Sequence, residues 1–202
     1  MSALAPAGIA AKVTTAFADV QAKTTDNGQP FLLVPAAALP AVARFVRDDA
    51  TLRFDAVMDL TGYDALKYPS TPSSDAIVVV YLLFSYQHRH KLTLKVLAPR
   101  SECAVPTMSG IWPAAIYFER EVWDLLGVHF SGHPSLRRIM CPEDWVGHAL
   151  RKDYRYPDDY HGVLHLRDGQ HFESSPPRGA VPVAVPPVAA PPGAVPPAGG
   201  AA

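Results

Sequence analysis

The side chains best suited to chemistry gather between residues 118 and 154. His129, His133 and His148 could bind a metal ion, and Cys141 could act as a nucleophile. On a helix, the spacing of His129 and His133 would place both imidazoles on one face. Glycines and a proline interrupt this stretch, so we do not expect a helix here. No CxxC or HExxH pair is present, and local hydrogen bonding by these histidines is the preferred interpretation.

Cys141 is a weak candidate for thiol catalysis. A reactive thiolate needs exposed, electropositive surroundings, which Arg137 and Arg138 would supply. The apolar residues Ile139 and Met140 precede the cysteine, however, and favour a small buried thiol.

Motifs for other enzymatic chemistry are missing from the sequence. It contains neither GxGxxG nor GxxxxGK[ST], so nucleotide binding has no support. Glu119 and Glu121 lie two residues apart and would point to different sides of a helix, so they do not form an acid–base pair.

A docking surface explains this stretch better than a catalytic site. We expect Glu119, Arg120 and Trp123 on the side of a helix that faces away from its apolar stripe. Arg120 and Asp124 have the spacing of a surface ion pair. An ordinary solvated charged surface remains the alternative. Three tryptophans are of a type enriched at interfaces: Trp112, Trp123 and Trp145.

Strands and helices must position this surface. Residues 30–35, 54–64, 76–87 and 91–96 have the composition of strands, and 76–87 reads as a strand buried on both faces. The short gap between the last two predicts an antiparallel hairpin. Residues 36–49 have helical periodicity, with Leu39, Val42, Ala43 and Val46 on one face.

A second helix is predicted over residues 113–126. Pro113 fits its first turn, and Gly127 fits a left-handed residue at its end. Ala115, Phe118, Val122 and Leu125 would form its apolar stripe.

The predicted fold class is α+β. It combines a mostly antiparallel sheet with helices packed on one side, an extended loop region and a disordered Pro/Ala-rich C-terminal tail. The domain would span residues 1–173 and the tail residues 174–202.

Bulk properties narrow the function further. The 202 residues carry a net charge of −1, which does not favour nucleic acid or anionic lipid as partners. Two separate cysteines, Cys103 and Cys141, fit a reducing compartment. The N-terminus does not resemble a signal peptide. No apolar run approaches the roughly 20 residues that span a bilayer, so any membrane association is expected to be peripheral.

The stretch from Trp112-Pro113 to Tyr154 carries an ordered series of motifs. It includes Glu119-Arg120-Glu121, Gly132-His133-Pro134 and Leu136-Arg137-Arg138, followed by PEDW, Gly147-His148 and LRKDY. The series closely resembles the C-subunit (30-kDa) family of respiratory NADH–quinone oxidoreductase, complex I. The match is strongest over residues 105–154 and looser over the predicted strands. Ala149 and Arg155 stand where the family usually has proline, and the tail is not part of the family pattern.

This resemblance implies a scaffold subunit in the peripheral arm of a proton-translocating complex. It would bind no cofactor itself, and FMN, iron–sulfur clusters, NADH and quinone would belong to other subunits. Its partners would be the D-like quinone-site subunit and iron–sulfur subunits, on the cytoplasmic side of the cell (inner) membrane. The residues implied at interfaces or in the architecture are Glu119, Arg120, Glu121, Asp124, His133, Arg137, Arg138, Trp145, His148, Arg151, Lys152, Asp153 and Tyr154.

Three alternatives stay open at this point. The chain could serve the equivalent role in a related membrane-bound hydrogenase or in a ferredoxin- or F420-linked dehydrogenase. It could be a stand-alone metal or thiol enzyme that uses the histidines and Cys141. It could also be a free adaptor that binds partners through its Pro-rich tail.

Overall fold

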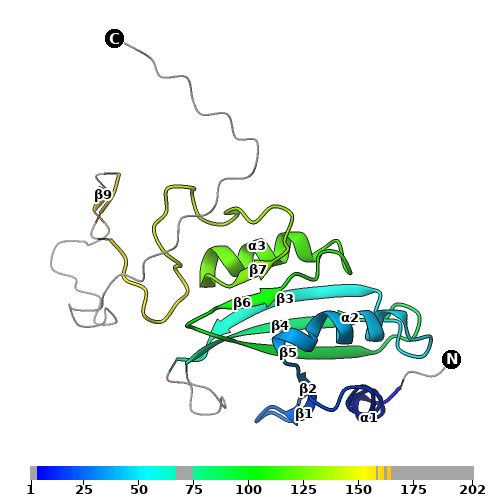
Figure 1. Cartoon of the computed structure of the whole chain (residues 1–202). Coiled ribbons are helices and arrows are strands. Elements are labelled where there is room, and N and C mark those ends of the chain that lie inside the picture. The colour runs from blue at the N-terminus through cyan, green and yellow to red at the C-terminus, as the bar shows by residue number, and fades with distance from the viewer. Residues whose placement is uncertain (1–3, 67–74, 158, 162, 165–202) are drawn as a thin grey trace.

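The computed structural model describes residues 4–66, 75–157, 159–161 and 163–164. Helices lie between groups of strands along these ranges (Figure 1). The helices are α1 (Pro6–Ala16), the short 3-10 helix η1 (Ala36–Ala38), α2 (Leu39–Asp48) and α3 (Ala115–Leu126). The strands are β1 (Gln21–Thr24), β2 (Pro30–Leu33), β3 (Ala56–Asp64), β4 (Ala76–Phe84), β5 (Lys91–Pro99), β6 (Ala104–Pro106), β7 (His129–Ser131), β8 (Asp159–Tyr160) and β9 (Val163–Leu164).

A five-stranded sheet forms the centre of the molecule, in the order β1-β2-β5-β4-β3. Strands β4 and β5 pair antiparallel from Ala76 opposite Pro99 to Phe84 opposite Lys91, which confirms the predicted hairpin. The pairs β1–β2 and β3–β4 are also antiparallel, whereas β2 and β5 run parallel. The sheet is therefore mostly antiparallel, as the sequence predicted.

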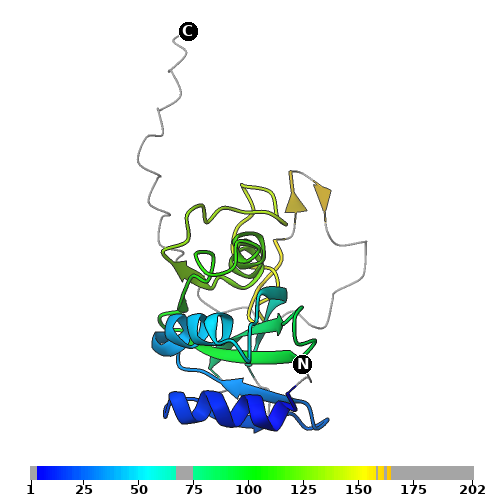
Figure 2. The ribbon, with the colours of Figure 1, turned by 90° about the vertical axis from the view of Figure 1, so that its right-hand side faces the viewer.

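One face of this sheet carries the main hydrophobic core. The register aligns Gly62, Val79 and Val96 on that face, and both valines are fully buried. Buried residues of all three α-helices join the same apolar cluster, so the helices pack on one side. The helices follow one another along the sheet, from α1 beside β1 and β2 to α3 over β3 (Figure 1, Figure 2).

The opposite face of the sheet is only partly covered. Val78 of β4 is buried there, but its neighbours Val80 and Leu82 are half-buried. The prediction that this strand is buried on both faces is therefore correct for one face and only partly correct for the other.

Helix α2 follows the predicted pattern closely. Its stripe of Leu39, Val42, Ala43 and Val46 is fully buried, as its helical spacing requires. Pro40 lies in the first turn, where a missing backbone N–H leaves no hydrogen bond unmade.

Helix α3 differs from its prediction in two respects. It begins at Ala115, two residues later than predicted, because Pro113 lies in the turn that precedes it. Its fully buried stripe contains Glu119 in place of Phe118 and Leu126 in place of Leu125. Ala115 and Val122 are buried as predicted, whereas the other two members of the predicted stripe were each wrong by one position. Apolar periodicity alone could not place a carboxylate in the interior.

Close packing between α3 and β3 depends on Gly62. A Cβ atom added at this glycine would lie 2.7 Å from Leu126 Cδ1 and 3.3 Å from Val122 Cγ1. The missing side chain lets the helix lie directly on the strand, near the C-terminal end of β3.

An extended region follows α3, as predicted. After β7, residues 132–157 contain no helix or strand. Strand β7 pairs parallel with β6, an interaction that the sequence did not indicate. The tail predicted over residues 174–202 lies outside the described residues.

Candidate functional site: a docking surface on the loop after α3

A buried carboxylate at the end of α3 organises the loop of residues 132–157. Asp124 is fully buried, and its Oδ2 accepts the backbone N–H groups of Ile139, Met140 and Cys141 at 3.0, 2.8 and 2.9 Å. Burial alone would raise the pKa of Asp124, but these donors and the Arg138 guanidinium outweigh it and lower the pKa. Asp124 is thus ionised at neutral pH, and its carboxylate binds three consecutive amides of the loop to the end of α3.

Arg138 completes this arrangement from the loop side. Its guanidinium pairs with the Asp124 carboxylate and donates to the carbonyl oxygens of Trp145 at 2.7 Å and Gly147 at 3.0 Å. Its central carbon also lies 5.8 Å from the centre of the Trp123 ring. A planar cation with several donors can hold separate turns of a loop together, which an ammonium group cannot match.

Arg120 also acts within the chain. Its Nε donates to the Arg137 carbonyl oxygen at 3.0 Å, and its Nη2 donates to the Arg138 carbonyl oxygen at 2.9 Å. The predicted Arg120–Asp124 pair was therefore wrong, because Arg138 reaches Asp124 from the loop. The side chain of Arg137 is exposed, and Glu121 is half-exposed on α3.

Residues of the loop 132–157 cap the C-terminus of α3. Gly127 has the left-handed conformation that was predicted, with φ of 75°. Arg151 Nε donates to the Leu126 carbonyl oxygen at 2.6 Å, and His148 Nδ1 donates to the Asp124 carbonyl oxygen at 2.9 Å. A Cβ atom at Gly127 would lie 2.6 Å from His148 Nε2, so glycine also permits this close approach.

The imidazole of His148 is neutral in this position. Burial lowers its pKa, and the nearby guanidinium groups of Arg151 and Arg138 lower it further, against the hydrogen bond to Asp124. A positive Arg151 at a helix C-terminus also complements the helix dipole. His148 and Arg151 therefore stabilise the fold of the loop.

A second ion cluster joins the loop to the sheet. Arg100 pairs with Asp64 at the end of β3 and donates from Nη1 to Asp153 Oδ2 at 3.0 Å. The backbone N–H of Lys152 donates to Asp64 Oδ2 at 2.8 Å. Burial would raise the pKa of Asp64, but Arg100 and two amide donors lower it. The sequence did not indicate the roles of Asp64 and Arg100, since both partners lie far from the loop along the chain.

Glu119 lies inside the protein, which corrects its predicted outward position. Its Oε1 accepts the Met108 backbone N–H at 2.6 Å, and its Oε2 accepts the Thr107 hydroxyl. Burial raises the pKa of Glu119 to about 7. His133 Nε2 lies 4.0 Å from this carboxyl and donates to the Ile116 carbonyl oxygen at 3.0 Å. Because burial lowers the pKa of His133, its ring is neutral at neutral pH.

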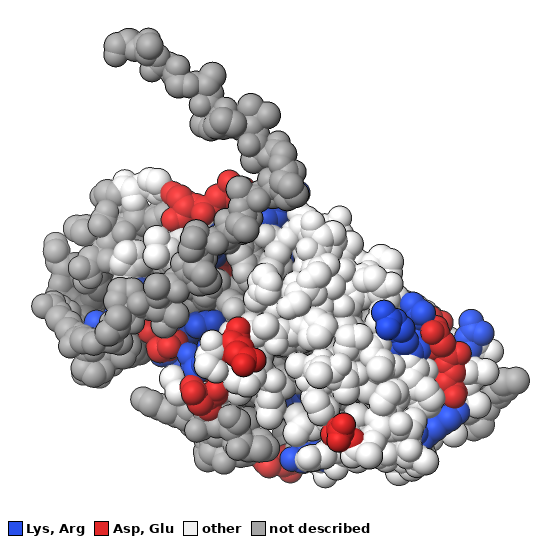
Figure 3. Space-filling model, viewed as in Figure 1, with Lys and Arg blue, Asp and Glu red and all other residues white. Residues whose placement is uncertain are grey.

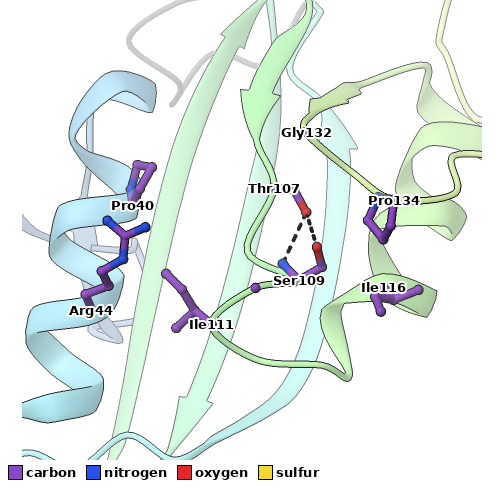
Figure 4. Close-up of a pocket in the computed structure, with 9 residues that line it drawn as sticks. Pro40, Arg44, Thr107, Ser109, Ile111, Ile116, Gly132 and Pro134 are labelled. Atoms are coloured by element: carbon purple, nitrogen blue, oxygen red, sulfur yellow. Dashed lines mark hydrogen bonds between the residues drawn. The ribbon is translucent and has the colours of Figure 1, made fainter.

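Thr107 also lines a small pocket of about 450 Å³. Figure 4 shows Thr107 and Ser109 joined by hydrogen bonds beside Ile111 and Ile116, with Arg44 on the facing helix. Among the described residues that line the pocket, Arg44 is the one ionisable group. The lining therefore provides no acid–base pair for catalysis.

The remaining chemical candidates do not converge on an active site. Cys141 is half-buried and not fully buried as predicted, and burial together with Asp124 raises the pKa of its thiol. His129 is exposed on β7. Within the part of the chain that the structure describes, no three His, Cys, Asp or Glu side chains are placed to hold a metal ion.

The outer side of the loop exposes large apolar side chains. Trp145 and Tyr154 stack with ring centres 6.4 Å apart, and Tyr156 packs edge-on against Tyr154 at 5.0 Å. We call the following set the loop surface: Ile139 (41% exposed), Met140 (61%), Val146 (82%), Leu150 (56%) and Tyr156 (62%). These exposed residues were not among the predicted contact residues. Their signal in the sequence is the presence of apolar side chains within a Gly- and Pro-rich segment.

Two of the proposed tryptophan anchors have other positions. Trp112 is buried, and its Nε1 donates to the Phe54 carbonyl oxygen at 2.9 Å, so its prediction as an exposed anchor was wrong. Trp123 is half-buried against Arg138 and His148. Trp145 is half-buried among the tyrosines beside the loop surface.

Charge is not concentrated in one large basic area on the face seen in Figure 3. Blue and red side chains occur together in small groups toward its margins, around a broad uncharged area. Among the described residues, no helix has the length and apolar character needed to cross a membrane.

Comparisons with known proteins agree with the motifs of the loop. The family model described as "Respiratory-chain NADH dehydrogenase, 30 Kd subunit" matches residues 32–160. The C subunit of the NADH-quinone oxidoreductase of Acidothermus cellulolyticus is 38% identical over 147 residues, covering 71% of this chain and 74% of that protein. The C subunits of Roseiflexus sp. and Chloroherpeton thalassium are 46% and 41% identical, covering 55% and 61% of this chain. The chain spans 62% and 49% of their lengths.

A relative with a longer chain joins two subunit names. The C/D subunit of the NADH-quinone oxidoreductase of Pseudomonas fluorescens is 41% identical over 136 residues, covering 66% of this chain and 23% of that protein.

Solved structures confirm the predicted fold class. A trypsin-resistant fragment of Nqo5 matches with a TM-score of 0.57 and 25% identity, covering 65% of this chain and all of the fragment. A chain of an archaeal membrane-bound sulfane sulfur reductase shares the fold, with a TM-score of 0.55 and 23% identity over 68% of this chain and 77% of that chain. Because the family model matches more than half of its residues, this chain belongs to the 30-kDa subunit family of respiratory-chain NADH dehydrogenase.

Proposed function

We propose that this chain is a scaffold subunit, without a cofactor of its own, in the peripheral arm of a proton-translocating NADH–quinone oxidoreductase. Its task is to hold neighbouring subunits in fixed geometry on the cytoplasmic side of the cell membrane. NADH oxidation, electron transfer through iron–sulfur clusters and quinone reduction belong to the partner subunits. The names of its relatives support the identity of this complex.

One observation carries the scaffold role: a rigidly held loop displays exposed apolar residues. A buried ion pair between Asp124 and Arg138 fixes the inner side of the loop, together with the hydrogen bond from Arg151 to the Leu126 carbonyl oxygen. The outer side presents Val146 and Leu150 to solvent. Long loops without regular structure persist mostly where they have a function, and clustered exposed apolar side chains are typical of contact sites.

The quinone-site D subunit is the proposed main partner. A relative named C/D supports this choice, because a fused chain keeps two proteins permanently next to each other. We assign the loop surface to the contact with D and the predicted residues Arg138, His148 and Arg151 to its support. Iron–sulfur subunits of the peripheral arm are the further proposed neighbours.

The chemistry of the chain supports a role without cofactors. An iron–sulfur cluster takes about four thiolates, whereas this sequence has two cysteines. Cys103 is buried beside Arg151, and Cys141 lies at the Asp124 site. Both thiols are accounted for by contacts within the fold.

A native gel of gently solubilised membranes tests the proposal. The gel is stained for NADH oxidation and probed for this chain, and a tail-deleted chain lacking residues 174–202 runs beside it. The proposal predicts that both forms migrate with a large NADH-oxidising band.

Other outcomes identify other functions. A large band without NADH oxidation would assign the chain to a related complex with another electron donor. Migration as a free small protein would contradict the scaffold role, and loss of binding upon tail deletion would favour the adaptor alternative.

A further inference from the structure

The face of the sheet that the helices leave uncovered has an uneven composition. Alternation along the strands places Tyr63, Val78, Lys95 and Leu97 on this face, opposite the main core. Val78 is buried, and the other three are half-buried. None of these four residues belongs to the main apolar cluster. A sheet face with this much apolar area is an unusual surface for a protein that remains alone.

A groove of about 810 Å³ runs over this face. Its lining comes from the turn between β1 and β2, from strands of the sheet, from Leu126 of α3, and from Leu150 and Lys152 of the loop after α3. Its floor consists mainly of Phe31 and the sheet residues named above. The groove shares Leu150 with the loop surface, and its other lining residues lie outside that set.

Lys95 lines the groove and lies near two aromatic rings. Its Nζ is 4.2 Å from the centre of the Phe31 ring and 5.8 Å from that of Tyr63. Partial burial lowers the pKa of Lys95, and no carboxylate forms an ion pair with it in the described part of the chain. Ring faces attract the cation but leave its N–H groups without strong acceptors. Among the described residues, the ammonium thus lacks a matching anion.

The charges around the groove favour an anionic occupant. Lys23, Lys95 and Lys152 line it, and Asp26 at the β1–β2 turn is one of two acidic residues in the lining. The other acidic residue, Asp64, is paired with Arg100. The lining is consequently net positive and apolar at the same time, which suits a carboxylate flanked by apolar side chains.

We infer that this groove binds an acidic peptide segment of another subunit, with one carboxylate on Lys95 and neighbouring apolar side chains against Phe31, Tyr63 and Leu97. The inference rests on the proposed function, since the segment comes from the same assembly. It adds a second contact region on the side of the sheet away from the helices. The loop surface and the groove together would let the chain join two neighbours.

Zero-length coupling with a carbodiimide tests the inference in the solubilised complex. This reagent joins an amine to a carboxylate only where the two are in contact. Lys12, whose Nζ lies 2.7 Å from Asp49, serves as a positive control within the chain. We expect Lys95 to be coupled to an aspartate or glutamate of another subunit.

Acetylation of lysines provides an independent measurement. We expect Lys95 to react at least about tenfold more slowly in the complex than in the free full-length chain, as for a site about 90% occupied. Lys91 is the matched reference, because it lies on the same strand and the same face but is exposed outside the groove.

A pair of variants separates binding from folding. Lys95→Met keeps an unbranched side chain against Phe31 and removes the charge, and Lys91→Met is its control. We expect Lys95→Met to leave the free chain folded and to weaken its retention in the complex at raised salt by about tenfold or more. Lys91→Met should change retention less than about twofold.

The outcomes distinguish this inference from the proposed function. If the chain is in the complex but Lys95 reacts as fast as in the free chain, the groove is not occupied and only this inference fails. Coupling of Lys95 to a carboxylate of its own chain would also overturn it. If the chain is in no large complex, both proposals fail.

Discussion

The sheet with its helices and the loop of residues 132–157 are stabilised in different ways. The sheet core consists of alternating apolar residues such as Leu94 and Val96, which need only to be apolar and of suitable size. The loop depends on specific polar groups, chiefly Asp124 and Arg138, each of which makes several hydrogen bonds.

This difference explains how the loop can present a surface. A loop held by apolar burial would have to turn its apolar side chains inward. Because a buried ion pair and side-chain hydrogen bonds fix this loop to α3, residues such as Val146 and Leu150 are free to face outward. Such a design is sensitive to single changes, since removing one partner leaves a buried charge uncompensated.

The largest expected effect comes from Arg138→Ala. It removes the guanidinium from buried Asp124 and from two carbonyl oxygens, so the free energy of unfolding should fall by about 3–5 kcal/mol. Urea unfolding of the full-length chain measures it. Arg137→Ala, at an exposed neighbour, should cost less than about 0.5 kcal/mol. Equal losses for the two variants would show that buried charge does not hold the loop.

The second expected effect is a dependence of stability on pH. Glu119 has a folded-state pKa of about 7, above its ordinary value of 4.5. Its contribution to the free energy of unfolding is fully present below pH 4.5 and is lost as the pH rises through about 7. The loss should be on the order of 3 kcal/mol. Urea unfolding between pH 5 and 8 should show this slope for the native chain and not for Glu119→Gln.

Asp124 should act in the opposite direction. The pKa of Asp124 is lowered in the folded state. Its contribution to the free energy of unfolding is therefore present above the pKa of the unfolded state and is lost as the pH falls through the pKa of the folded state. Cleavage of the loop by a protease should therefore increase at acidic pH. A loop whose resistance to cleavage does not fall at any acidic pH would contradict this assignment.

Conservative substitutions should affect the two regions unequally. Arg138→Lys keeps the charge but cannot reach all acceptors of the guanidinium, so it should cost about 1–3 kcal/mol. Leu94→Met conserves volume in the core and should cost less than about 1.5 kcal/mol. Thermal unfolding of both variants compares them directly. A larger loss of stability for Leu94→Met than for Arg138→Lys would contradict the different stabilisation of the sheet core and the loop.

The smallest expected effect on stability is at the loop surface. Val146→Asp changes a side chain that is 82% exposed, so the free energy of unfolding should change by no more than about 0.5 kcal/mol. The amount of chain in the large complex should nevertheless fall. Tyr86→Asp, 70% exposed at the turn between β4 and β5, is the control and should assemble normally. Normal assembly of both variants would exclude the loop surface as a contact.

Periodicity predicted the regular elements well where one face is apolar. In α2, every third or fourth residue is buried, which gives its apolar stripe. In β5, every second residue is buried, which gives its alternation. The same method misplaced the stripe of α3, because Glu119 and Asp124 are buried for their hydrogen bonds. Polar residues in the interior have no periodic signal.

The assignment of the candidate site residues shows the same limit. The motifs around Arg137, Arg138 and His148 indicated an important region, and the structure places most of these side chains on partners within the chain. The parallel pairing of β6 with β7 and of β2 with β5 joins segments far apart in sequence. Such pairings depend on how the whole chain closes on itself.

Sequence patterns alone were enough to establish the α+β class, the hairpin of β4 and β5, the end of α3 at Gly127 and the family of the chain. Each of these depends on local spacing or on an ordered run of residues. Which charges face inward was settled by tertiary packing. The partner of Asp124 lies 14 residues away and that of Asp64 lies 36 residues away. Burial makes those pairings necessary, because an ionised carboxylate in the interior requires donors that no local pattern can specify.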